Sequence, residues 1–73
     1  MNNHQVSSSS LDELQARVRS QLGGRVQHFQ VLNRANGLII TGRTATYYAK
    51  QLAQHTVMEA SVLPILANNI EVY

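Results

Sequence analysis

Histidine and serine side chains are the residues of this chain that could act as metal ligands or nucleophiles. The three histidines, His4, His28 and His55, lack the spacing of a ligand set, and a zinc site needs three or four convergent ligands. The serine run at positions 7–10 has no recognisable histidine and carboxylate partners that would activate a hydroxyl group. We therefore expect no enzyme, no metal site and no cofactor.

Arginine, lysine and tyrosine side chains could instead bind an anionic partner. The candidate contacts with an anionic surface are Arg25, Arg34, Arg43, Lys50 and Tyr47. The three arginines lie near the ends of predicted strands, and a well-placed charge at a membrane surface contributes about 1 kcal/mol. Tyr47 could stack on a partner. The simpler interpretation is that the arginines only confer solubility, and that Tyr48 is partly buried while Tyr47 is a surface aromatic.

Two glycine pairs invite comparison with loops that bind phosphate. Neither Gly23-Gly24 nor the pair Gly37 and Gly42 has the glycine-rich spacing followed by Lys and Ser or Thr that such a loop requires. Turn chemistry explains them better: Gly24 closes a helix in the left-handed conformation, and Asn36-Gly37 forms a hairpin turn. Gly42 marks a β-bulge or the close approach of another backbone.

Length and composition place the chain among small folded domains. Its 73 residues make one domain, of which 44% are hydrophobic and 14% charged, as is ordinary for a folded chain. The formal net charge of +2 is a weak preference for anionic partners. Because there is no cysteine, disulfides, zinc–cysteine sites and thiol nucleophiles are excluded.

The N-terminus is polar and gives no targeting signal. We expect residues 1–9 to form a disordered tail before a single domain at 10–73. The tail lacks the basic and apolar regions of a signal peptide, and no apolar run reaches the ~18–20 residues that span a bilayer. The chain as written is therefore expected to be cytoplasmic, or envelope-associated if it is part of an exported protein.

The first half of the domain is predicted to be a helix followed by a β-hairpin. Ser10 and Glu13 form a capping box that starts the helix at Ser10. Its apolar stripe consists of Leu11, Leu14, Val18 and Leu22. Phe29 and Val31 alternate on one face of a first strand, although Val26 breaks the period of two. A second strand follows the hairpin turn.

The second half is predicted to be another helix and a last strand. Thr46 caps a helix over residues 47–60. The inward face of this helix is Ala49, Leu52, Ala53, Thr56 and Ala60. Pro64 requires a connector before a strand at 66–72. The order α-β-β-α-β predicts an α+β fold with two helices packed on one face of a three-stranded sheet, and it leaves open where the last strand pairs.

Three motifs carry a family resemblance. The run Asn36-Gly-Leu-Ile-Ile-Thr-Gly42 resembles the Asn/Asp-Gly-Val-x-Leu-Ser-Gly hairpin of the BON domain (bacterial osmotically inducible and nodulation domain). Tyr48-Ala-Lys-Gln-Leu-Ala53 resembles its alanine-bearing helix, and Leu66-Ala-Asn-Asn-Ile-Glu-Val72 resembles its closing strand. The chain departs from the family at Val62-Leu63, where the family has Gly-Val. The resemblance implies a module of membranes and the periplasm that binds phospholipid or other envelope ligands without catalytic residues.

The favoured hypothesis is therefore a non-enzymatic BON-like module that binds phospholipid, another envelope ligand or a partner protein. Two alternatives stay open. A KH-like nucleic-acid domain shares the element order, but it needs a Gly-x-x-Gly loop between two helices that this chain lacks, so nucleic acid is the less favoured partner. An adaptor or homodimer could use an unpaired edge of the sheet, because three strands leave two edges.

Overall fold

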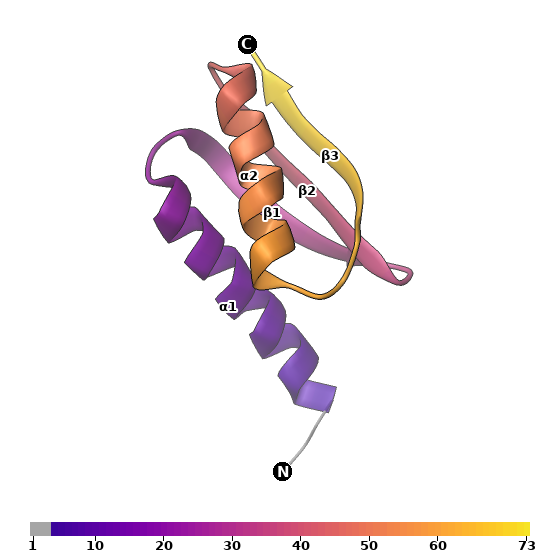
Figure 1. Ribbon diagram of the computed structural model, residues 1–73. Coiled ribbons are helices and arrows are strands. Elements are labelled where there is room, and N and C mark those ends of the chain that lie inside the picture. The colour runs from indigo at the N-terminus through magenta and orange to yellow at the C-terminus, as the bar shows by residue number, and fades with distance from the viewer. Residues whose placement is uncertain (1–3) are drawn as a thin grey trace.

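The computed structural model describes residues 4–73, with side chains from residue 10 onward. Its elements are α1 (His4–Leu22), β1 (Val26–Arg34), β2 (Gly37–Thr44), α2 (Tyr47–Ala60) and β3 (Ile65–Val72). Figure 1 shows both helices on the same face of the sheet, and among the described residues nothing covers the other face. The predicted α+β fold with the order α-β-β-α-β is confirmed.

β2 is the central strand of the sheet, whose order is β1-β2-β3. It pairs antiparallel with β1 through the hairpin and parallel with β3 through the α2 crossover. The sequence left this pairing open, because a helical connection can return the last strand to either side of the hairpin. One consequence is that β2 and β3 finish at the end of the sheet where β1 begins.

The core lies between the two helices and the covered face of the sheet. Its buried side chains are Val18, Leu22, Val26, Phe29, Val31, Leu38, Ile40, Ala49, Ala53, Val57 and Ile70. Ala49 and Ala53 let α2 approach the sheet closely, as the small-residue face predicts. Val57 also belongs to the buried face, although the predicted stripe omitted it. Each fully buried large side chain contributes about 1.5–3 kcal/mol to folding.

Helix α1 begins earlier than predicted. It includes residues 4–9, so Ser10 is an exposed residue inside the helix and not its N-cap. No glycine or proline occurs between His4 and Ser10, and nothing in that stretch therefore breaks a helical backbone. Helix replaces the predicted tail at 4–9, and residues 1–3 lie outside the described residues.

Gly23, and not the predicted Gly24, is the left-handed residue that ends α1. Gly23 has φ = 62°, a conformation that glycine adopts without steric cost. Its N–H donates to the carbonyl oxygen of Arg19 at 3.1 Å, which closes the last helical turn. Since the first residue after the helix makes this bond, Gly24 only leads the chain into β1.

A β-bulge in β1 explains why its apolar residues break the period of two. His28 and Phe29 together lie opposite Gly42 of β2, so β1 has one extra residue at this point. The extra residue shifts the alternation, and Val26 and Phe29 are both buried. A Cβ on Gly42 would lie 3.0 Å from the carbonyl oxygen of Gln27, which confirms the predicted close approach of another backbone.

The hairpin uses its residues differently from the predicted Asn36-Gly37 turn. The loop is Ala35-Asn36, in which Ala35 has φ = 52°, and Gly37 is the first residue of β2. Gly37 is needed for space: a Cβ there would lie 2.5 Å from Cγ of Leu66 and 2.8 Å from the carbonyl oxygen of Pro64. The glycine therefore lets the start of β3 pack against the hairpin.

Helix α2 has the predicted boundaries and the predicted cap. Oγ1 of Thr46 accepts a hydrogen bond from the N–H of Ala49 at 3.1 Å, which satisfies one of the free donors of the first turn. Ser61 follows the helix in an extended conformation. The carbonyl oxygen of Pro64 then accepts from the N–H of Leu38 at 2.8 Å and brings the chain back to β2.

Two substitutions test which position of the hairpin needs glycine. Ala35→Gly should raise the free energy of unfolding by about 0.5–1 kcal/mol, because relief of the left-handed backbone exceeds the added freedom of the unfolded chain. Gly37→Ala should lower it by about 1–3 kcal/mol, because the new Cβ must displace Leu66 and the backbone at Pro64. Urea unfolding followed by circular dichroism measures both changes. A destabilising effect of Ala35→Gly would contradict the observed turn.

Candidate functional site

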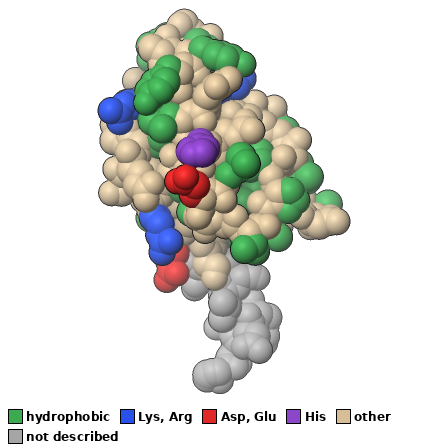
Figure 2. Space-filling model, in the orientation of Figure 1, with side chains coloured by type: hydrophobic (Ala, Val, Ile, Leu, Met, Phe, Trp, Pro, Cys, Tyr) green, Lys and Arg blue, Asp and Glu red, His purple; other side chains and the backbone are tan. Residues whose placement is uncertain are grey.

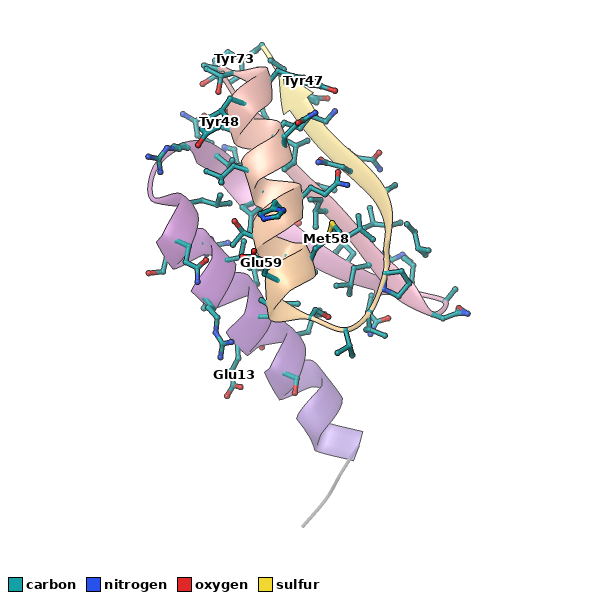
Figure 3. All side chains as sticks on the ribbon, in the orientation of Figure 1. Glu13, Tyr47, Tyr48, Met58, Glu59 and Tyr73 are labelled. Atoms are coloured by element: carbon teal, nitrogen blue, oxygen red, sulfur yellow. The ribbon has the colours of Figure 1, made fainter. Side chains whose placement is uncertain are left out.

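All three tyrosines of the chain lie at one end of the molecule, where α2 begins and β3 finishes. Tyr47, Tyr48 and Tyr73 are 62%, 69% and 60% exposed. Figure 3 shows the three residues at this end, away from Glu13 and Glu59. We define the tyrosine end as Tyr47, Tyr48 and Tyr73 together with Arg25, Arg43 and Lys50.

The topology brings these residues together from separate parts of the chain. β2 and β3 both finish at this end, β1 begins there, and a connection of only two residues leads from β2 to α2. The buried hydroxyl of Thr44 donates to the carbonyl oxygen of Arg25 at 2.7 Å. This bond joins the last residue of β2 to the residue before β1, and it holds Arg25 near the start of α2.

Arg43 is held by Glu71, its cross-strand neighbour on β3, and by Tyr73, which follows β3. Its Nε lies 3.7 Å from Oε1 of Glu71, and its Cζ lies 4.8 Å from the centre of the Tyr73 ring. A cation–π contact at an exposed site contributes about 0.5–1 kcal/mol, whereas an exposed ion pair adds little. Arg43 is therefore a positioned guanidinium beside an exposed ring.

Four of the five predicted contacts with an anionic surface share the tyrosine end, and Arg34 does not. Arg34 is the last residue of β1, beside the hairpin, while Arg25 precedes the strand. At the rise of a β-strand, the two arginines are separated by on the order of 25 Å, so they cannot both contact a surface at one end. The predicted partial burial of Tyr48 is wrong, because Ala49 is the inward-facing residue of that helical turn.

Charge is unevenly distributed between the two ends. The basic residues at or near the tyrosine end are Arg19, Arg25, Arg43 and Lys50, and Glu71 is the acidic residue there. The other acidic residues are Asp12, Glu13 and Glu59. Figure 3 shows Glu13 and Glu59 away from the tyrosines, with Glu59 toward the other end of α2. These five charged residues together have a formal charge of +3, against +2 for the whole chain.

The middle of α2 carries a pair that sequence reasoning missed. Nε2 of His55 lies 3.0 Å from Oε2 of Glu59. Their spacing of four residues was the available signal, since it places two side chains on one face of a helix. Both side chains are exposed, so the pair contributes little to stability.

An apolar groove lies at the opposite end, between α1, the hairpin and the connection from α2 to β3. Its apolar lining is Leu11, Leu14, Leu38, Ala60, Val62 and Leu63, and its volume is about 490 Å³. Val62 is 99% exposed. Figure 2 shows hydrophobic side chains at the lower right of the helix face as well as at its upper end. This groove was not predicted from the sequence, in which Val62-Leu63 stood out only as a departure from the BON pattern.

The uncovered face of the sheet changes character along its length. A half-buried apolar row near the hairpin consists of Leu32, Ile39 and Ala67. The next row toward the tyrosine end consists of Gln30, Thr41 and Asn69. Sheets that bind single-stranded RNA stack the bases on aromatic side chains. The described strands place no aromatic side chain on this face, so it does not favour the nucleic-acid alternative.

Side chains occupy part of both sheet edges. On β1, the carbonyl oxygen of Phe29 accepts from Nη2 of Arg19 at 2.8 Å, and the N–H of Val31 donates to Oε1 of Gln15 at 2.9 Å. On β3, the side chain of Asn68 accepts one backbone N–H of the strand. Occupied backbone groups cannot pair with another strand, so these bonds weaken the alternative of an adaptor or homodimer through an open edge.

The described residues contain no group of three or more histidine, aspartate or glutamate side chains that could hold a metal ion. Within the same part of the chain, neither helix has the length and apolar character needed to cross a membrane. The sequence matches no protein-family model, and comparison with curated proteins and with solved structures gives no match.

Proposed function

We propose that this chain is a non-enzymatic, BON-like module that binds an anionic phospholipid surface through its tyrosine end. The observation that carries the proposal is the gathering of three exposed tyrosines and a local positive charge at one end of the fold. The motifs that resemble the BON domain support the same class of ligand. The module would act at an anionic leaflet, within the cell envelope if the chain is part of an exported protein.

The tyrosines suit the boundary between water and lipid. A tyrosine ring is apolar and its hydroxyl is polar, and tyrosine is enriched at the headgroup level of membrane proteins for this reason. The three rings contribute little to the core, because each is at least 60% exposed. Contact with a lipid surface would bury apolar area that folding leaves in water.

The basic residues supply the attraction to anionic headgroups. Arg25, Arg43 and Lys50 would each contribute about 1 kcal/mol near an anionic surface, and Glu71 offsets part of the contribution of Arg43. The first turn of α2 adds N–H groups and the positive end of the helix dipole. Because exposed charges are screened over about 8 Å at physiological ionic strength, binding should weaken as salt is added.

Loss of one charge at the tyrosine end should weaken vesicle binding. Arg25→Gln should lower the partition coefficient onto vesicles of phosphatidylcholine and phosphatidylserine about fivefold, because about 1 kcal/mol of attraction is lost. Co-sedimentation at low ionic strength measures this change. No binding of the unmodified protein under these conditions would refute the lipid proposal.

Arg34→Gln is the matched control for this experiment. It removes the same side chain and the same charge, but from the hairpin end of β1. Its partition coefficient should remain close to that of the unmodified protein. An equal loss in both variants would show that only the net charge matters, and it would contradict a site at the tyrosine end.

Tyrosine fluorescence should report the docking directly. The chain contains no tryptophan, so its intrinsic emission comes only from the tyrosine end. Brominated lipids in phosphatidylserine vesicles should quench this emission, whereas brominated pure phosphatidylcholine vesicles should quench it much less.

The double substitution of Tyr47→Ser and Tyr48→Ser should weaken binding to phosphatidylserine vesicles roughly tenfold through lost apolar contact.

Met58→Ser is the control for the tyrosine variants. Met58 is a 55% exposed apolar residue of the same helix, toward its other end, as Figure 3 shows. Its substitution should leave vesicle binding unchanged. A similar loss in this variant would indicate adhesion by any exposed apolar side chain and would argue against the tyrosine end.

A further inference from the structure

A hollow of about 610 Å³ lies on the uncovered face of the sheet, beside the bulge of β1. The polar side chains that line it are Arg19, His28, Gln30, Thr41, Arg43 and Asn69. Gly42 lines it at the bulge, and Glu71 lies beside Arg43. Side chains from α1 and from all three strands therefore meet here, and none of them is apolar.

His28 lines the hollow and has a strained backbone conformation. Its φ is 57°, in the left-handed region that disfavours residues with a Cβ. The bulge needs such a backbone at this position, and glycine would supply it with less strain. A strained residue in a polar hollow is an indication of function, because a histidine is found where stability alone would favour glycine.

Several hydrogen-bond donors in the hollow lack partners within the described part of the protein. The side chains of Gln30, Thr41 and Asn69 make no hydrogen bond to other described residues. Arg19 uses one N–H on the carbonyl oxygen of Phe29, out of the five that a guanidinium carries. The side chains of Gln30, Thr41 and Asn69 could therefore donate hydrogen bonds to one ligand, together with the two arginines.

The charges that face the hollow favour an anion. Arg19 and Arg43 are positive, and Glu71 is the single carboxylate among the lining residues. Glu71 lies on the Nε side of Arg43 at 3.7 Å, so the two terminal nitrogens of that guanidinium are left for another partner. Arginine recognises phosphate oxygens through paired N–H groups, and hydroxyl and amide donors complete such sites.

We propose that this hollow binds a phosphomonoester, held by Arg19, Arg43 and His28 and oriented by the donors of Gln30, Thr41 and Asn69. The proposal does not depend on docking by the tyrosine end. The same phosphomonoester chemistry occurs in soluble metabolites and in the headgroup of phosphatidic acid, and the experiments separate these two sources.

Titration with glycerol 3-phosphate, followed by two-dimensional amide NMR, tests the soluble source. The unmodified protein should show saturable shifts centred on His28, Thr41 and Asn69. Thr41→Val keeps the shape of the side chain and removes its hydroxyl donor, and it should weaken binding about tenfold. The Arg34→Gln variant serves as the control and should bind like the unmodified protein.

His28→Gly separates the ligand role of His28 from its part in the bulge. This variant should raise Tm by about 4 °C through relief of the left-handed backbone, and it should also weaken phosphomonoester binding at least about fivefold. Gain of stability together with loss of affinity supports the proposal. Unchanged affinity in His28→Gly overturns it, as does unchanged affinity in Thr41→Val.

Vesicles of phosphatidylcholine and phosphatidic acid test the lipid source. If the headgroup is the ligand, His28→Gly should weaken binding to these vesicles and leave binding to phosphatidylserine vesicles unchanged. Absence of a His28-dependent interaction with both glycerol 3-phosphate and phosphatidic acid overturns the proposal. Failure of the tyrosine-end proposal would appear differently, as absent binding of the unmodified protein to phosphatidylserine vesicles.

Discussion

The close contact between the bulge of β1 and Gly42 of β2 constrains much of this structure. One extra residue in β1 turns both Val26 and Phe29 toward the helices, which a regular strand could not do with residues three apart. The contact requires glycine at position 42, because a Cβ would meet the β1 backbone. It also places His28 on the uncovered face and presents the carbonyl oxygen of Phe29 to α1. The packing of the core, the occupied edge of β1 and the hollow on the uncovered face therefore all depend on the same β-bulge.

The mixed sheet explains how distant residues share a surface. Because β2 is antiparallel to β1 and parallel to β3, the beginning of one strand and the finish of two others lie together. The N-terminus of α2 lies at the same end, so its tyrosines join Arg25, which precedes β1, and Arg43, near the end of β2. These exposed rings contribute little to the core. Their position at a positively charged end is the reason why we propose that they contact a partner.

The two faces of the sheet differ in their side chains and in whether a helix covers them. The covered side buries apolar residues against both helices, and the small side chains of α2 allow that helix to pack closely. The uncovered side has an apolar row near the hairpin and a polar, charged region beside the bulge, and neither helix covers it, while Gln15 and Arg19 occupy edge groups of β1. A small domain that protects an edge but leaves a polar face open is better suited to binding a ligand on that face than to extending its sheet.

The sequence by itself determined the element order, the α2 boundaries and the Thr46 cap, because these depend on local periodicity and local hydrogen bonds. It also located Gly42 as a place of close approach. Tertiary structure decided what local pattern could not: the order of strands, the loss of Arg34 from the site, and the hollow around His28. It also decided that Gly37 is needed for space, because β3 packs against the hairpin there, and that the positive φ of the hairpin loop lies at Ala35. Contacts between segments far apart in the chain leave no periodic signal in a single sequence.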